Sequence, residues 1–129
     1  MSAKRVLSVG QCGADNWSIT RALKTHFGAE VVPADGAAEA LGLLEQQAFD
    51  LVLVNRVFDA DGGSGVGFTR QLTQREPRVT VPVMLVSNYQ DAQDEAVKAG
   101  AKPGFGKAAL GQPAMLARLR DVLGPAPEV

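Results

Sequence analysis

A glycine-rich stretch at 59–65 holds the side chains that could carry charge-based chemistry. Asp59 and Asp61 are its carboxylates, and carboxylates can ligate Mg²⁺ or accept a phosphoryl group. Three nearby glycines, Gly62, Gly63 and Gly65, could cradle a phosphate with their backbone N–H groups. Their spacing matches neither a P-loop nor a dinucleotide fingerprint. The pattern therefore favours a turn with two acids in water, and a substitute acidic site is the alternative.

Three further residues have side chains that could react, bind a metal or anchor a partner protein. Cys12 is the one cysteine and His26 the one histidine, so the sequence predicts neither an internal disulfide nor a histidine-based metal site. The thiol of Cys12 is either redox active or inert. Trp17 stands two residues before Ile19, off the apolar face of its predicted helix. It either anchors a partner or covers the loop beneath it.

The composition narrows the class of protein. The 129 residues carry 13 basic and 14 acidic side chains, for a net charge of −1, which gives no electrostatic argument for nucleic acid or an anionic membrane as partner. The apolar runs are too short to span a bilayer and no signal peptide is apparent, so we expect a cytoplasmic protein. We expect one domain over 1–124 and a short flexible tail at 125–129.

Strands and helices alternate along the chain. Apolar runs predict strands at 5–9, 30–33, 50–54, 82–86 and 102–105. Helical spacing predicts five helices between and after them, the first capped near Asp15, the second capped by Asp35 and the last covering 113–123. Strands joined by single helices form a parallel sheet with right-handed crossovers. A ligand site then belongs at the carboxyl ends of the strands, in the loops after Val9, Val54, Val86 and Phe105.

Three stretches, 34–54, 65–72 and 96–120, together resemble the receiver domain of two-component response regulators of the chemotaxis-regulator type. The likeness spans nearly the whole chain. It implies a flavodoxin-like (βα)5 fold, with a five-stranded parallel sheet in the order 2-1-3-4-5 and helices on both faces.

The resemblance also implies a phosphorylation pocket, and its acidic positions are missing. The acidic pair that binds Mg²⁺ falls on Gly10 and Gln11, and the phosphoacceptor aspartate falls on Asn55. The hydroxyl and the lysine that bind phosphoryl oxygens fall on Ser87 and Lys107. Mg²⁺ binds through carboxylates, and acyl-phosphate formation needs a carboxylate nucleophile. We therefore expect a degenerate pocket with no metal and no catalytic residue.

Other departures from the family agree with this. Gly104 stands where the family has a switch aromatic, and Ala108 stands where it has a proline. Two pocket residues match the family. Ser87 either caps a turn or binds phosphate, and the sequence supports both roles equally. For Lys107 the sequence favours an ordinary solvated side chain over a functional role. Asn55 is expected to hydrogen-bond neighbouring backbone.

The resulting hypothesis is a pseudo-receiver: a signalling module, not an enzyme and without a cofactor, that binds a protein partner without phosphorylation. One alternative is a phosphotransfer switch with Asp59 or Asp61 as acceptor, and another is a small-ligand flavodoxin-like protein. We expect a monomer or a weak homodimer. The resemblance places the partner surface on the fourth helix, fifth strand and fifth helix, around Gly104, Ala108 and Leu110, with the Trp17 side as the next candidate. Leu110 either joins that surface or packs over the sheet edge.

Overall fold

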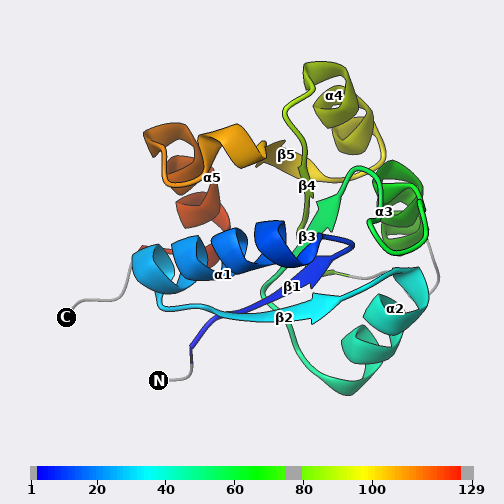
Figure 1. Cartoon of the computed structure of the whole chain (residues 1–129), viewed down its shortest axis with the longest axis horizontal. Coiled ribbons are helices and arrows are strands. Elements are labelled where there is room, and N and C mark those ends of the chain that lie inside the picture. Colours follow the sequence, from blue (N-terminus) through cyan, green and yellow to red (C-terminus); the bar gives the residue numbers. More distant parts are fainter. Residues whose placement is uncertain (1–2, 75–79, 126–129) are drawn as a thin grey trace.

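The computed structural model describes residues 3–74 and 80–125 and places a single parallel sheet at the centre (Figure 1). The five strands run in the order β2-β1-β3-β4-β5, which confirms the predicted order. Every neighbouring pair is parallel, with a register irregularity between β4 and β5. The strands are β1 (Arg5–Val9), β2 (Glu30–Ala34), β3 (Leu51–Asn55), β4 (Val83–Val86) and β5 (Lys102–Phe105).

Helices cover both faces of this sheet (Figure 1). Helices α1 and α5 pack on one face, and α2, α3 and α4 pack on the other. A short 3₁₀ helix, η1, follows β5 and precedes α5. The helices are α1 (Gly13–Phe27), α2 (Ala37–Gln46), α3 (Gly65–Gln74), α4 (Gln90–Lys98), η1 (Lys107–Ala109) and α5 (Pro113–Leu123).

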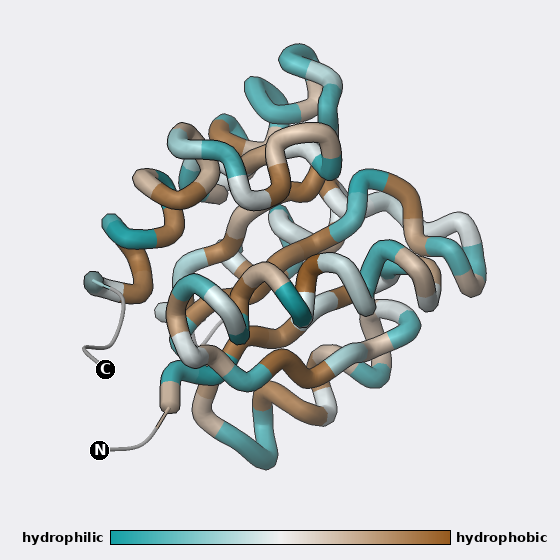
Figure 2. The backbone as a smooth tube through the Cα atoms, turned by 60° about the vertical axis from the view of Figure 1, so that its left-hand side comes forward, coloured by the Kyte–Doolittle hydropathy of each residue, from teal (hydrophilic) through white to brown (hydrophobic). Residues whose placement is uncertain are grey.

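The central strand β3 shows why the sheet is covered twice. Its side chains alternate between faces, so Leu51 and Leu53 join the core under α1 and α5, while Val52 and Val54 join the core under the other three helices. All four are fully buried. Figure 2 shows the resulting hydrophobic segments running through the middle of the molecule. A continuous apolar strand is typical of a parallel sheet buried on both faces.

Two predicted helix caps were wrong. Helix α1 begins at Gly13, and its N-cap is Cys12, whose Sγ accepts a hydrogen bond from the Asp15 N–H at 3.4 Å. Asp15 is therefore inside the first turn, where the helix dipole stabilises a carboxylate. Helix α2 has Gly36 as its N-cap, without a side-chain hydrogen bond, in place of Asp35.

The remaining boundaries follow the prediction closely. Gly28 ends α1 with a φ of 63°, a left-handed conformation that suits glycine. Met115 replaces the half-buried Leu116 on the buried stripe of α5. No helix within residues 3–74 and 80–125 is long and apolar enough to cross a membrane. Of the predicted tail, 126–129 lie outside the described residues.

Candidate functional site

The loops after β1, β3, β4 and β5 meet at the carboxyl edge of the sheet and bring the predicted pocket residues to one end of the molecule (Figure 1). Gly10 directly follows β1, and Asn55 is the last residue of β3. Ser87 follows β4, and Lys107 opens η1 after β5. The topology thus assembles the positions that the resemblance identified.

A phenyl ring takes the space above Gly10. Gly10 has a φ of 77°, and a Cβ built on it would lie 2.7 Å from Cγ of Phe58 and closer still to Cδ1. The Phe58 side chain is buried, and its ring meets that of Phe68 edge to face at 5.9 Å between centroids. A side chain at position 10 would have to displace this ring. The neighbouring Gln11 is half-buried and offers a neutral amide.

The Asn55 side chain is held as a hydrogen-bond donor. Its Nδ2 donates to the carbonyl oxygen of Gly10 at 3.0 Å and to that of Val57 at 2.8 Å. Both amide protons are therefore used in hydrogen bonds. This agrees with the prediction that the Asn55 side chain hydrogen-bonds neighbouring backbone. A carboxylate has no proton to donate. Two carbonyl oxygens converging on one point therefore suit an amide and oppose an aspartate.

The glycine-rich loop is a folded turn that positions Phe58. The Phe58 N–H donates to the Gly63 carbonyl at 2.8 Å, and the Gly62 N–H donates back to the Phe58 carbonyl at 2.8 Å. Oδ1 of Asp61 accepts from the Gly63 N–H at 2.8 Å. The Asp59 N–H donates to the Gly10 carbonyl at 2.9 Å, tying the turn to β1. Both acids are exposed, and no group of three or more His, Cys, Asp or Glu side chains within 3–74 and 80–125 could hold a metal ion.

Lys107 lies across the carboxyl edge and pairs with α1. Its Nζ is 2.6 Å from Oδ2 of Asp15, and both side chains are about one-third exposed. The Lys107 ammonium lowers the pKa of the Asp15 carboxyl, a shift that partial burial opposes and the Cys12 side chain assists. The sequence predicted a solvated lysine, and the structure shows a partly exposed one that is paired with an acid of α1. The long side chain spans from η1 to the first turn of α1 and neutralises an acid there.

Ser87 caps a turn, which is one of the two roles predicted for it. Its Oγ accepts from the Tyr89 N–H at 3.1 Å. Beside it, the buried Gln93 of α4 joins two strands: its Nε2 donates to the carbonyls of Leu85 and Ser87 at 2.9 and 3.0 Å. Its Oε1 accepts from the Gly104 N–H at 3.0 Å. All its polar groups are satisfied, so α4 is fixed to the ends of β4 and β5.

Solved structures match this architecture closely. A protein from Chloroflexus aurantiacus described as a response regulator superposes with a TM-score of 0.82 at 18% identity, covering 95% of this chain and 98% of that one. A response regulator from Thermotoga maritima gives 0.72 at 23% identity, covering 95% and 98%. The chemotaxis response regulator CheY4 of Vibrio cholerae gives 0.71 at 19% identity, covering 95% and 100%. The fold is that of a response-regulator receiver domain.

At these sequence identities the similarity shows the fold alone, and the comparisons of the sequence itself found no match. No family model matches it, and no curated protein is significantly similar. Within the receiver fold, this chain holds a phenylalanine ring and an amide donor where the resemblance called for acids. The chemistry of the site therefore depends on its own side chains.

The four residues predicted to form the partner surface lie in different environments in the structure. Gly104 is buried, because β5 passes too close to β4 for a side chain, so it can offer no side chain to the predicted partner surface. A Cβ built there would lie 3.1 Å from the Leu85 carbonyl carbon and closer to its oxygen. Ala108 is exposed, and Leu110 is half-buried against the core under α1 and α5. Trp17 is 62% exposed.

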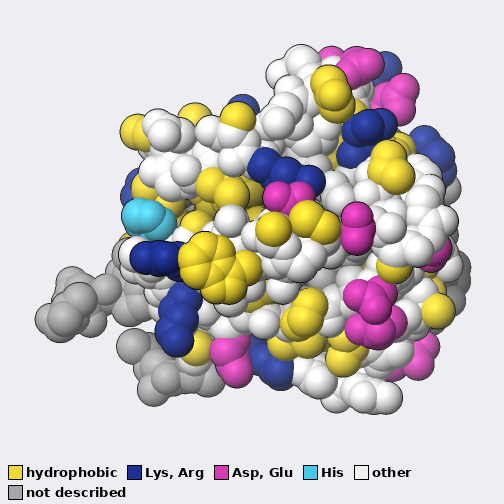
Figure 3. Space-filling view, viewed as in Figure 1, with side chains coloured by type: hydrophobic (Ala, Val, Ile, Leu, Met, Phe, Trp, Pro, Cys, Tyr) yellow, Lys and Arg dark blue, Asp and Glu magenta, His cyan; other side chains and the backbone are white. Residues whose placement is uncertain are grey.

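Trp17 and Leu110 come together on one surface. They line a shallow hollow of about 400 Å³ with Arg21 and His26, and the Arg21 guanidinium lies 5.2 Å from the centroid of the Trp17 ring. Figure 3 shows hydrophobic and basic side chains side by side over the face that carries α1. A second hollow, of about 390 Å³, lies between α4, β5 and α5 and is lined by Gly104, Ala108 and Arg118 among others.

Three contacts in the site escaped the sequence analysis: the Phe58 ring, the Asp15 carboxylate and the Gln93 amide. For Phe58 a signal was present, because glycine at position 10 leaves space that the fold must fill, and Phe58 is the one aromatic residue of the loop after β3. Asp15 and Gln93 gave no such signal. Polar residues in the first turns of helices read equally well as solvated.

Proposed function

We propose that this chain is a receiver-like module of a two-component or phosphorelay system that acts through protein contacts without being phosphorylated, and that it is not an enzyme. The receiver fold and the likeness of its three sequence stretches support the signalling class. Three features of the site support the absence of phosphoryl chemistry: the filled space over Gly10, the amide of Asn55 and the engaged Lys107.

The Phe58 ring over Gly10 is the observation that carries the proposal. A Mg²⁺ site needs oxygen ligands in near-octahedral order and keeps several waters. Here the position nearest the end of β1 faces the carbon atoms of a buried ring. Phosphoryl transfer also builds negative charge that a cation has to neutralise. Lys107 is paired with Asp15 and is not free for that role.

Rigid contacts support a signal read without a phosphorylation switch. Gln93 makes three hydrogen bonds that join α4 to β4 and β5, and Lys107 ties η1 to α1. A receiver that is switched needs two arrangements close in free energy. The contacts of this chain favour a single arrangement, so in our proposal its partner surface is presented constitutively.

Two surfaces fit the partner role in this proposal. One is the hollow between α4, β5 and α5, where the resemblance places the contact face. Arg118 lines this hollow, and one of its guanidinium N–H groups donates to the Gly104 carbonyl. The other surface holds Trp17, Arg21 and Leu110. Tryptophan and arginine are the residue types that most often dominate binding energy at interfaces.

Phosphorylation by acetyl phosphate with Mg²⁺, followed by intact-mass measurement, tests the proposal. We expect no phosphoryl adduct, while a phosphorylatable receiver domain in the same buffer gains one. An adduct that disappears in an Asp59→Asn or Asp61→Asn variant would overturn the proposal in favour of a substitute acceptor. Retention of the same partners from cell extract with and without acetyl phosphate, reduced by Trp17→Ala or Ala108→Asp, would support constitutive binding.

A further inference from the structure

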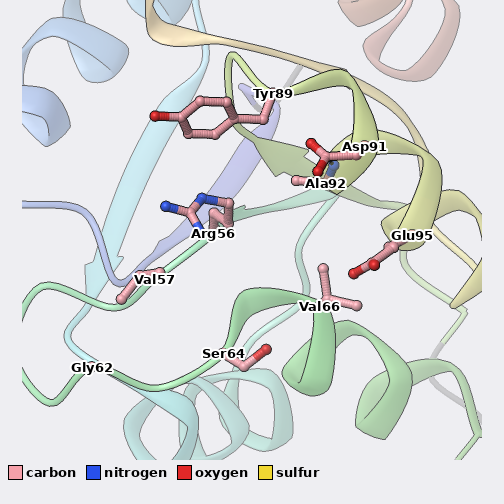
Figure 4. Close-up of a pocket in the computed structure, with 9 residues that line it drawn as sticks. All are labelled: Arg56, Val57, Gly62, Ser64, Val66, Tyr89, Asp91, Ala92 and Glu95. Carbon is pink, nitrogen blue, oxygen red and sulfur yellow. Dashed lines mark hydrogen bonds between the residues drawn. The ribbon is translucent and has the colours of Figure 1, made fainter.

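A cleft between the N-terminal ends of α3 and α4 lies outside both of these surfaces. It has a volume of about 440 Å³. Figure 4 shows its walls: Arg56, Val57 and Tyr89 on one side, Asp91 and Glu95 on α4, and Val66 on α3. No contact described for the degenerate pocket uses these side chains, so the cleft is a separate feature of the surface.

Exposed apolar side chains gather at this cleft. Among the residues that the structure describes, four large hydrophobic side chains are exposed, and two of them, Tyr89 at 60% and Val57 at 43%, line its walls. The Arg56 guanidinium lies 5.1 Å from the centroid of the Tyr89 ring, so the ring is supported from one side. Exposed apolar residues that lie together often mark contact surfaces.

The charges of the cleft select what fits it. Asp91 and Glu95 stand one helical turn apart on α4, and within 3–74 and 80–125 neither forms an ion pair. Asp91 accepts a hydrogen bond from the Ala92 N–H at 3.0 Å. The single cation of the walls, Arg56, is stacked on Tyr89. Two carboxylates against one guanidinium leave the cleft negative, and apolar side chains lie beside them.

We infer that this cleft binds a lysine or arginine side chain presented by a partner protein. The aliphatic stem of such a side chain would lie against Val57, Val66 and Tyr89, and its cationic head would reach Glu95 and Asp91. Long basic side chains combine an apolar stem and a charged tip in this way. The inference rests on the proposed function for the claim that the ligand is a protein, and it names the chemistry by which that protein is recognised.

An NMR titration of the ¹⁵N-labelled full chain tests the inference. The probe is an acetylated, amidated peptide of alternating leucine and lysine, and the matched peptide has glutamate in place of lysine. We expect saturable shifts at the amides of 56–66 and 89–95 with the lysine peptide. Glu95→Gln should weaken this binding about two- to fivefold, which is the effect of losing one exposed ion pair. Asp94→Asn, an exposed acid on the same helix outside the cleft, is the control and should leave it unchanged.

Several results would overturn the inference. These are the absence of a saturable shift in the cleft, equal weakening by Asp94→Asn, or preferential binding of the glutamate peptide, which would make Arg56 an anion site instead. The outcome is independent of the phosphorylation assay. A phosphoryl adduct together with lysine-peptide binding would contradict the proposed function and leave the cleft assignment standing.

Discussion

Replacing Asn55 by aspartate restores the residue type that a phosphorylatable receiver needs, and the structure predicts that it destabilises this chain. The wild-type amide donates to the carbonyl oxygens of Gly10 and Val57 at 3.0 and 2.8 Å. An ionised carboxylate loses both hydrogen bonds and places its own negative oxygen against those carbonyls. The Gly10 carbonyl keeps its bond from the Asp59 N–H, so one acceptor remains partly satisfied.

The size of the effect follows from these two bonds. Each contributes about 0.5–1.5 kcal/mol net, and repulsion between the carboxylate and the carbonyl oxygens adds to their loss. We expect Asn55→Asp to lower the free energy of unfolding by about 2–4 kcal/mol at pH 7. Asn55→Ala, which removes the bonds without adding charge, should lose about 1–3 kcal/mol.

The pH dependence of the variant gives a second signature. The two carbonyl oxygens raise the pKa of the introduced carboxyl in the folded state above its unfolded value of about 3.9. A carboxyl with a raised pKa stabilises the fold when protonated. The stability deficit of Asn55→Asp against wild type should therefore be full above the raised pKa and shrink as the pH falls toward 4.

Urea denaturation followed by far-ultraviolet circular dichroism measures these quantities, with and without millimolar Mg²⁺. A metal that bound the folded variant would stabilise it by mass action, and we expect no such stabilisation. An Asn55→Asp variant as stable as wild type, or one that Mg²⁺ stabilises, would refute the argument that position 55 is arranged for an amide donor.

Three further predictions concern the contacts around the site. Phe58→Ala should cost about 3–5 kcal/mol of unfolding free energy because it leaves a cavity over Gly10, and a loss below about 1 kcal/mol in urea denaturation would show that the ring is not packed. Gln93→Leu removes the hydrogen bonds to the Leu85 and Ser87 carbonyls and from the Gly104 N–H and should cost about 2–4 kcal/mol, whereas the exposed Asp94→Ala control should stay within about 0.5 kcal/mol; equal losses would contradict the bridging role. Lys107→Met should raise the pKa of Asp15 toward 3.8, as followed by NMR, and should cost less than about 1 kcal/mol because the pair is partly exposed. Since the pair lowers the pKa of Asp15, its contribution is present at neutral pH and is lost as the pH falls through that lowered pKa, and an unchanged Asp15 titration in the variant would disprove the pairing.

Periodicity and family likeness together predicted the fold. The apolar run at 51–54 identified the central strand, because a strand buried on both faces has no polar alternation. The strand order came from the resemblance combined with the alternation of strands and helices. Helix caps were less predictable: Asp35 is a common capping residue, yet Gly36 occupies the N-cap of α2. Such choices depend on how the chain enters the helix, which local sequence does not determine.

The site was predictable in what it lacks and not in what replaces it. Gly10 and Asn55 stand at positions where the family has carboxylates, so the sequence alone showed that these carboxylates are missing. Three contacts could be seen only in the three-dimensional structure. They are the packing of the Phe58 ring, the ion pair of Lys107 with Asp15, and the three hydrogen bonds of the Gln93 amide. These contacts join residues on different elements, so their formation depends on the packing of the whole sheet.

An NMR titration with Mn²⁺, which shares the oxygen-ligand preference of Mg²⁺ and broadens nearby amide signals, tests the central claim most directly. If the Phe58 ring and the Asn55 amide fill the site, the amide signals of Gly10, Asn55 and Phe58 should broaden no more than those of other buried amides as Mn²⁺ is added. Selective, saturable broadening of these three signals would show that a metal enters the pocket, and would contradict the account.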